Sequence, residues 1–112
     1  MSGRPQQALR RIHEWCDQHG AVAAVVVWPF LQSLDAGAFY PFTAIHDAVR
    51  TFCAEEGAHG SAMPFLDLLP ALRGQRTADL WVSPADMHPN ERAQTIVAPA
   101  LADFVAGLLH GR

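Results

Sequence analysis

The sequence predicts an α/β fold in which helices cover a parallel sheet, giving three layers. Two short apolar runs, residues 21–28 and 64–69, are predicted strands, and helical segments precede, separate and follow them. The resulting order α-β-α-β-α calls for parallel strands joined by a crossover helix. Half of the 112 residues are apolar and 17% are charged, which is typical of a globular chain that forms one domain over residues 1–112.

The first predicted helix covers residues 5–20. Pro5 suits the start of a helix because its φ angle is already helical, and Gly20 suits the end. One face carries apolar residues at helical spacing, so we expect that face to be buried, with Leu9, Ile12 and Cys16.

The first predicted strand, residues 21–28, is apolar without alternation and includes several valines. This pattern is typical of a strand that is covered on both faces. Pro29 ends it, and residues 30–41 are predicted to form a long loop. Because ligands of open α/β sheets bind at the carboxyl ends of the strands, we expect this loop to form a wall of a site.

A second helix is predicted over residues 42–57, with an apolar face made by Ile45, Val49, Phe52 and Cys53. Residues 64–69 follow as a strand, and residues 78–84 are expected to be extended or irregular. The last helix is predicted to begin after the N-cap residue Asn90 and to kink at Pro99. Since only two strands are predicted, one sheet edge would be exposed, and we expect a second copy or a partner to cover it.

The formal net charge of −3 and the absence of a basic run argue against a nucleic-acid or anionic-membrane partner. The apolar run 21–28 is shorter than the roughly 20 residues of a membrane helix, and residues 1–7 lack the apolar core of a secretion signal. We therefore expect a cytoplasmic protein. Cys16 and Cys53 lie on predicted buried faces and are expected to be reduced core thiols.

No metal or cofactor is expected. The run His13-Glu14-Trp15-Cys16-Asp17 is similar to the zinc pattern H-E-x-x-H, but Asp17 stands where the second histidine would be. The other histidines lack ligand spacing, so solvated or capping roles suffice for His13, His19, His46, His59 and His110. The tryptophans are interpreted as packing residues: Trp15, Trp28 and Trp81.

The main candidate for chemistry is the run Asp86-Met87-His88-Pro89-Asn90, predicted to lie on a loop before the last helix. A carboxylate close to a histidine can orient the imidazole as a general base, which is how many hydrolases activate a serine. Taken alone, an Asp-x-His triplet also fits an ordinary hydrogen-bonded loop histidine.

The run LWVSPADMHPNE, residues 80–91, resembles the last conserved block of SGNH/GDSL-type serine hydrolases, in which an Asp and a His precede Pro-Asn and a final helix. The resemblance extends back through residues 65–70 and 25–29, and it covers most of residues 8–109. It implies a partial flavodoxin-like three-layer α/β/α domain, the SGNH hydrolase fold without its N-terminal strands.

The same resemblance implies that His88 is the catalytic base and Asp86 the acid that orients it, in the hydrolysis of an ester or acetyl group. The commonest family spacing is Asp-x-x-His, whereas Ala85 holds that position here. The family's Gly-Asp-Ser nucleophile block is absent from this sequence. Three serines of this chain were considered as hydroxyl candidates and are interpreted as turn residues: Ser33, Ser61 and Ser83. An isolated copy should therefore hydrolyse esters poorly.

Three functional hypotheses follow. The chain is the acid–base part of an SGNH/GDSL-type hydrolase that takes an ester-type small molecule or carbohydrate ester once an N-terminal half complements it. Alternatively, it is a non-catalytic module that completes its sheet by self-association or with a partner chain. The third hypothesis is a degraded gene product without independent function.

Overall fold

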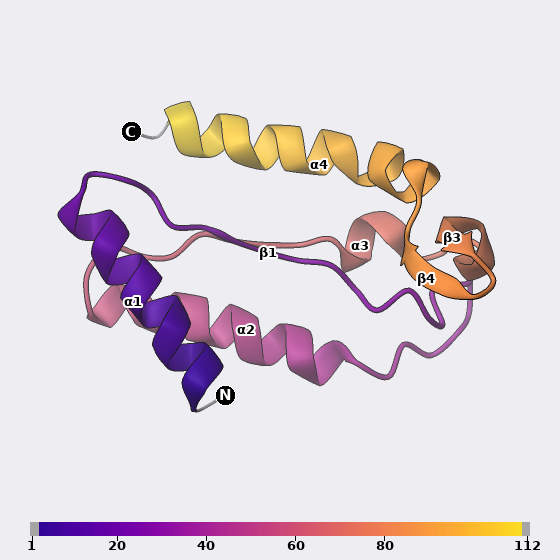
Figure 1. Ribbon diagram of the computed structural model, residues 1–112, viewed down its shortest axis with the longest axis horizontal. Coiled ribbons are helices and arrows are strands. Elements are labelled where there is room, and N and C mark those ends of the chain that lie inside the picture. Colours follow the sequence, from indigo (N-terminus) through magenta and orange to yellow (C-terminus); the bar gives the residue numbers. More distant parts are fainter. Residues whose placement is uncertain (1–2, 111–112) are drawn as a thin grey trace. The chain divides into compact units, whose positions relative to one another are not determined.

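The structure, a computed structural model, describes residues 3–110. Figure 1 shows its helices and strands as a ribbon coloured along the sequence. The chain divides into two compact units. Unit 1 comprises Met1–Val26 and Ala44–Leu66, and unit 2 comprises Val27–Thr43 and Asp67–Arg112. Each unit has its own buried residues and its own polar cluster, so the two are described separately.

Unit 1 contains helix α1 (Arg4–Gln18), most of helix α2 (Thr43–Glu55) and the 3₁₀ turn η1 (Glu56–Ala58). Helix α1 ends as predicted, because Gly20 adopts a positive φ of 71°. The backbone N–H of Ala21 then donates to the carbonyl of Cys16 at 2.9 Å, which is the six-to-one bond of a Schellman motif. The predicted glycine cap is confirmed.

The core of unit 1 lies on one side of α2. Phe52, Cys53 and Met63 are buried there, and five half-buried apolar residues pack against them: Leu9, Ala23, Val25, Val49 and Phe65. This arrangement places the strand residues Val25 and Phe65 against the predicted apolar face of α2. Cys53 is a free, buried thiol as expected, while Cys16 is free but only half buried.

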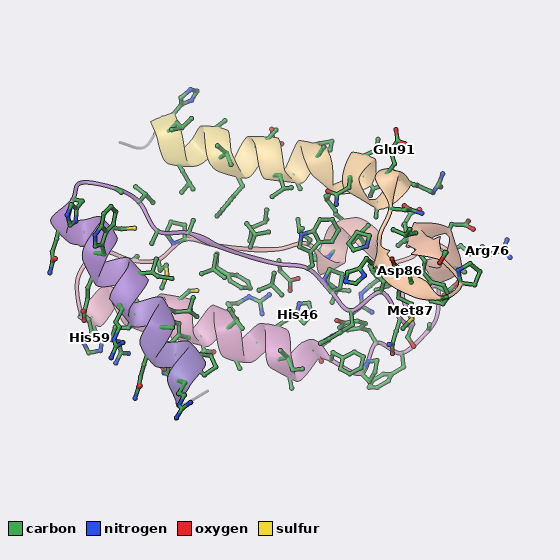
Figure 2. All side chains as sticks on the ribbon, viewed as in Figure 1. His46, His59, Arg76, Asp86, Met87 and Glu91 are labelled. Carbon is green, nitrogen blue, oxygen red and sulfur yellow. The ribbon has the colours of Figure 1, made fainter. Side chains whose placement is uncertain are left out.

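Two apolar residues predicted to face this core are instead exposed. Ile12 of α1 and Ile45 of α2 are both exposed, and in each helix the next residue is buried, namely His13 and His46. Figure 2 labels His46 on helix α2. The apolar pattern left these two histidines out of the buried faces because it treats histidine as polar and therefore external. Other predicted residues lie in or against the core: Leu9, Val49, Phe52 and Cys53. Burial of His13 costs little here, since both ring nitrogens have hydrogen-bond partners.

Strands β1 (Val25–Val27) and β2 (Phe65–Asp67) form a two-stranded sheet. The backbone N–H of Val25 donates to the carbonyl of Pro64, and that of Leu68 donates to the carbonyl of Val27, both at 2.9 Å. Because these bonds advance in the same direction along both segments, the strands are parallel. The chain thus contains a β-α-β sequence, and its broad α/β class is as predicted.

The first strand differs from its prediction in length and cover. Only three residues of the apolar run 21–28 form β1, and the prediction of a strand covered on both faces is wrong. Val22, Ala24 and Val26 are exposed, Val26 at 36%, while the residues between them are half buried. Because every residue of the run is apolar, the sequence does not reveal that exposed and half-buried residues alternate along it. Such alternation is the pattern of a strand covered on one face.

Unit 2 is organised around a β-hairpin that the sequence did not predict. Strand β3 (Trp81–Ser83) pairs antiparallel with β4 (Asp86–Pro89), with Ser83 opposite Asp86 and Trp81 opposite Pro89. The short helix α3 (Leu69–Leu72) and the 3₁₀ turn η2 (Thr77–Leu80) precede it. Residues 78–84 were expected to be extended or irregular, and residues 81–83 form one strand of this second, antiparallel sheet.

Helix α4 (Glu91–His110) completes unit 2. Its predicted N-cap is confirmed, because the side-chain oxygen of Asn90 accepts the backbone N–H of Ala93 at 3.0 Å. The helix continues through Pro99, and its buried residues, Ala93 and Val97, both lie before that proline. By length and composition α4 could cross a membrane, with a mean hydropathy of 1.3 over 18 residues. Core helices of soluble proteins pass the same test.

The loop after β1 is packed into unit 2. Within the predicted loop 30–41, Leu31, Leu34 and Tyr40 are buried. A parallel bridge joins Asp35 to Gly74, and the backbone N–H of Gly74 donates to the carbonyl of Leu34 at 2.6 Å. The loop is therefore held against the segment that leads into the hairpin.

Candidate functional site

The structure brings the two predicted site residues, Asp86 and His88, into direct contact in unit 2. The Nδ1 atom of His88 lies 2.5 Å from Oδ1 of Asp86, and the backbone N–H of His88 donates to the same oxygen at 3.0 Å. Both residues belong to strand β4. The expectation that this run lies on a loop is wrong, because the turn that reverses the chain lies just before it, between Ser83 and Asp86.

The hairpin explains the Asp-x-His spacing. Side chains two residues apart on a strand point to the same face, so Asp86 and His88 project together from β4. A three-residue spacing on the same strand would place the acid and the base on opposite faces. The departure from the commoner Asp-x-x-His pattern therefore suits the local structure of this chain.

The electrostatics of the pair favour an ionised acid. The backbone N–H of His88, and then its ring, donate to Asp86 and hold the pKa of that carboxyl below its ordinary value. An ionised carboxylate only accepts hydrogen bonds, so the Nδ1 atom of His88 carries a proton. In the neutral ring Nε2 then holds the lone pair that a general base needs. The side chain of His88 is 87% exposed, so this nitrogen is open to an incoming group.

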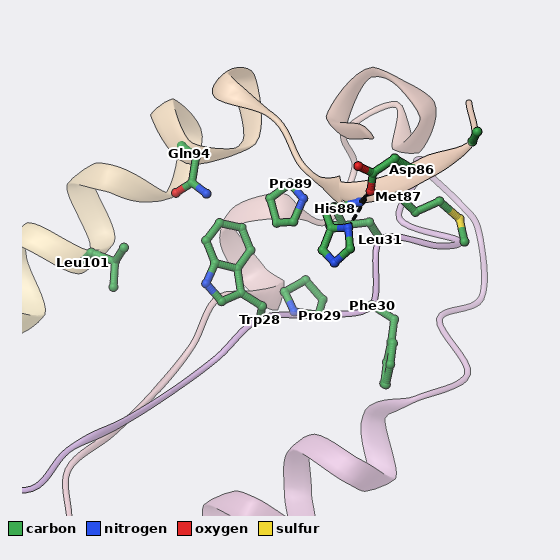
Figure 3. A pocket seen from close by; sticks show the side chains of 11 residues that line it. Trp28, Pro29, Phe30, Leu31, Asp86, Met87, His88, Pro89, Gln94 and Leu101 are labelled. Atoms are coloured by element: carbon green, nitrogen blue, oxygen red, sulfur yellow. Dashed lines mark hydrogen bonds and ion pairs between the residues drawn. The ribbon is translucent and has the colours of Figure 1, made fainter. Parts of the chain in front are cut away.

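The dyad lies at a pocket of about 720 Å³ within unit 2. Its walls are largely apolar and come from the segment that follows β1, the hairpin turn with strand β4, and helix α4 (Figure 3). They are formed by Trp28, Pro29, Phe30, Leu31, Ala85, Asp86, Met87, His88, Pro89, Gln94 and Leu101. The predicted loop 30–41 thus supplies Phe30 and Leu31 to this wall.

Hydrogen bonds and ring contacts hold the pocket walls in place. The indole N–H of Trp81 donates to the carbonyl of Leu31 at 2.8 Å, and the backbone N–H of Phe30 donates to the hydroxyl of Tyr40 at 2.9 Å. The Phe30 ring also packs against Phe42, with centroids 4.6 Å apart. Trp81 is therefore a packing residue as predicted, with a polar role that fixes the loop.

The dyad has no serine partner in the part of the chain that the structure describes. Ser83 accepts the backbone N–H of Ala85 at 3.3 Å within the hairpin turn. Ser33 has a φ of 56°, a backbone conformation common in turns. The interpretation of both as turn residues is thus supported, whereas Ser61 contacts His13 and Asp17 in unit 1.

Sequence reasoning missed a second polar cluster, which lies in unit 1. His13 was expected to be solvated or capping, yet it is 3% exposed and bonds to Glu56 and Ser61. Its partners lie more than 40 positions away in sequence, so no local motif could have indicated them. Among residues 3–110, no three His, Cys, Asp or Glu side chains converge as metal ligands.

The arrangement in unit 2 can accept and return a proton beside an apolar surface, and within residues 3–110 it lacks a nucleophile of its own. Comparisons of the chain with models of known protein families, with curated proteins and with solved structures find no match.

Proposed function

We propose that unit 2 is the acid–base part of an SGNH/GDSL-type hydrolase that cleaves an ester or acetyl group. The observation that carries the proposal is the Nδ1–Oδ1 contact of 2.5 Å between His88 and Asp86 at an apolar pocket. The Pro-Asn sequel supports it, since Asn90 caps the helix that follows, as in the family block that the sequence resembles. The finer flavodoxin-like fold is part of this proposal.

In this proposal His88 acts as the general base and Asp86 orients it. The Nε2 atom takes the proton of a serine hydroxyl as the serine oxygen attacks the ester carbonyl. Asp86 stabilises the imidazolium that forms, and His88 then gives the proton to the departing alcohol. The serine comes from a Gly-Asp-Ser segment outside this chain, so activity depends on complementation.

The pocket indicates the kind of group that the site holds. Trp28, Phe30, Met87 and Leu101 offer apolar contacts, and the polar side chains of the lining are those of Asp86, His88 and Gln94. No lysine or arginine lines this pocket, which favours an uncharged acyl or acetyl group over an anionic one. The proposed hydrolase needs no metal and no cofactor, and we propose that it works in the cytoplasm without a nucleic-acid or membrane partner.

Complementation tests the proposal. The chain would be mixed with, or fused behind, the N-terminal half of an SGNH hydrolase that carries the Gly-Asp-Ser block, and hydrolysis of 4-nitrophenyl acetate measured. We expect hydrolysis well above the sum of the separate halves. A stable, folded complex or fusion with no gain in hydrolysis would contradict the proposal.

A second candidate function is a module that completes its sheet by association. Within residues 3–110, β1 and β2 pair only with each other, and Val26 is 36% exposed. Unpaired strand edges and an apolar face favour pairing with a second copy. Sedimentation velocity over a range of concentrations tests this function, with Val26→Lys as the disrupting variant. A monomer at every concentration would exclude self-association.

A further inference from the structure

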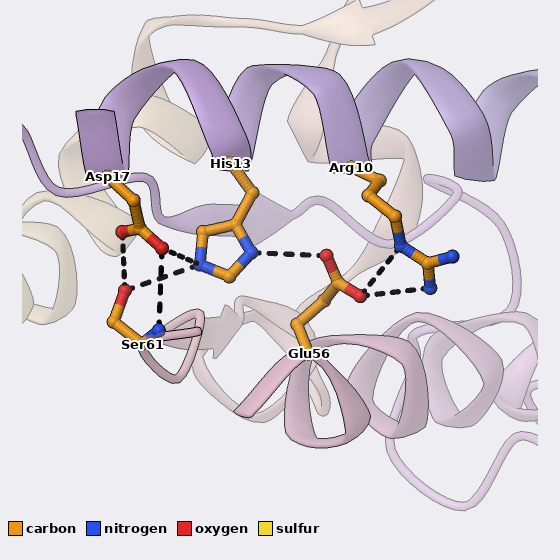
Figure 4. Close-up of polar contacts among 5 residues, drawn as sticks. All are labelled: Arg10, His13, Asp17, Glu56 and Ser61. Atoms are coloured by element: carbon orange, nitrogen blue, oxygen red, sulfur yellow. Dashed lines mark hydrogen bonds and ion pairs between the residues drawn. The ribbon is translucent and has the colours of Figure 1, made fainter. Parts of the chain in front are cut away.

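A partly buried polar cluster in unit 1 joins helix α1 to the segment that follows α2 (Figure 4). The Nδ1 atom of His13 lies 3.1 Å from Oε1 of Glu56, and its Nε2 atom lies 3.3 Å from Oγ of Ser61. The imidazole thus contacts a serine hydroxyl through one nitrogen and a carboxylate through the other, which is the order of groups in a serine hydrolase triad. The dyad of unit 2 takes no part in it.

Glu56 is fixed in position and ionised. Its side chain has no exposed surface, and its second oxygen accepts bonds from Nε and Nη2 of Arg10 at 3.1 and 3.0 Å. Burial acts to raise the pKa of Glu56, but the hydrogen bonds from His13 and Arg10 outweigh it and hold the pKa below its ordinary value. Since a carboxylate only accepts, the proton on the His13 ring sits at Nδ1. In the neutral ring Nε2 is then a lone pair facing Ser61.

Ser61 is the accessible member of the cluster, since its residue is exposed while His13 and Glu56 are buried. Asp17 holds it in place, with Oδ1 2.6 Å from the hydroxyl oxygen and Oδ2 3.4 Å from the backbone nitrogen. Asp17 also lies 3.5 Å from Nε2 of His13. The hydrogen bond from the Ser61 hydroxyl lowers the pKa of Asp17, which makes this carboxylate a weaker base than a neutral imidazole.

Gly60 permits this close approach. A Cβ atom at residue 60 would lie 2.7 Å from Oδ2 of Asp17, so a larger residue there would push the carboxylate away from Ser61. The cluster therefore depends on five side chains and on a glycine that leaves room for one of them. An imidazolium formed at His13 would face two carboxylates, Glu56 and Asp17, which favours the charge that develops during proton transfer.

We propose that Ser61 is a nucleophile activated by His13, and that unit 1 forms a covalent acyl-serine from small activated esters. In the resting protein the Ser61 hydroxyl donates to Oδ1 of Asp17, and for reaction it turns to Nε2 of His13, 3.3 Å away. The Ser61 oxygen then attacks the carbonyl carbon, its proton passes to Nε2 of His13, and the departing alkoxide leaves with that proton as an alcohol. Water then attacks the acyl-serine, gives a proton to His13, and releases the acid while Ser61 regains its proton. Glu56 and Arg10 are positioning residues.

A fluorophosphonate probe on the intact chain tests the proposal, because it traps activated serines: the Ser61 oxygen bonds to phosphorus, fluoride leaves, and the proton goes to His13. We expect mass spectrometry of peptides to find the adduct at Ser61, at least tenfold above Ser33 or Ser83. The labelling rate should rise with pH to a plateau, as for a serine activated by a general base, and the charged groups around that base are Glu56, Asp17 and Arg10.

Matched variants separate activation from mere exposure. Ser83→Ala and His110→Gln, the latter at an exposed histidine, should leave the Ser61 adduct unchanged, whereas His13→Gln should slow it at least tenfold while circular dichroism stays native. If His13→Gln does not fold, the pH profile of the unmodified chain decides. Three results would each overturn the proposal. They are no adduct at Ser61, an unchanged labelling rate in folded His13→Gln, and a labelling rate that rises with hydroxide concentration without reaching a plateau. Because His88 is not involved, this result is independent of the hydrolase proposed for unit 2.

Discussion

Asp86 accepts two hydrogen bonds from His88 on a single oxygen, one from the backbone N–H at 3.0 Å and one from ring Nδ1 at 2.5 Å. The backbone bond fixes the carboxylate beside the strand, and the ring bond then fixes the imidazole relative to that carboxylate. The acid and the base are therefore oriented by the hairpin alone, before any substrate or partner is present.

The tautomer of His88 provides a first test of this relationship. In the unaltered chain the neutral ring should carry its proton on Nδ1, because ionised Asp86 can only accept. In Asp86→Ala the Nε2–H tautomer should become much more populated. Nitrogen-15 NMR of the ring distinguishes the two forms. Equal tautomer populations in the two proteins would mean that Asp86 does not orient His88.

The buried carboxylate of unit 1 should contribute strongly to stability. Glu56→Gln leaves His13 and Arg10 without the charge that they face, and we expect a loss of about 1–3 kcal/mol in the free energy of unfolding. Urea denaturation measures this loss. The matched control is Glu55→Gln at the neighbouring exposed position, which should change stability little. Equal effects of the two substitutions would contradict the role of Glu56.

Stability should fall in acid. Hydrogen bonds hold the pKa of four carboxyl groups below the ordinary value. Ser61 donates to Asp17, Thr77 to Asp35 and His88 to Asp86. At Glu56, the bonds from His13 and Arg10 outweigh the opposite effect of burial. The unfolded chain therefore binds more protons than the folded one once the pH drops below about 5, so the stabilisation present at neutral pH is lost progressively. We expect Tm to decrease from pH 6 to pH 3. A constant or rising Tm over that range would contradict these contacts.

Thr77 should hold the loop of unit 2 in place. Its hydroxyl accepts the buried backbone N–H of Leu34 at 2.9 Å and donates to Asp35 at 2.5 Å. Thr77→Val keeps the shape but leaves the Leu34 N–H without its acceptor, so we expect a loss of about 1–3 kcal/mol in unfolding free energy. Thr95→Val, at an exposed position of α4, is the control. A smaller loss for Thr77→Val than for this control would rule out the role.

Local signals in the sequence were enough for the helices and their ends. Gly20 ends α1 and Asn90 caps α4, because both effects depend on the few residues around a helix terminus. The pairing of Asp86 with His88 could also be predicted from the sequence, since both residues lie on one short segment. The expected single domain over residues 1–112 stays a prediction, and the structure forms two compact units.

The remaining features depend on contacts between distant residues. The hairpin was missed because Pro84 and Ala85 do not form a recognisable turn sequence and the strands have three and four residues. The predicted face residues Val49, Phe52 and Cys53 of α2 lie in or against the core, whereas the burial of His13 was missed because its partner Glu56 lies 43 positions away. A polar side chain can be buried when a residue far away in the sequence satisfies its hydrogen bonds. The periodicity of apolar residues does not indicate such a partner.

The most direct test of the central proposal is the value of kcat/KM for 4-nitrophenyl acetate in the complemented protein, compared between His88→Gln and His59→Gln. His59 is an exposed histidine of unit 1 and serves as the matched control. We predict that His88→Gln lowers kcat/KM by about a thousandfold or more, since the serine loses its base, while His59→Gln leaves it unchanged. An equal value for both variants would show that His88 is not the base of this hydrolase.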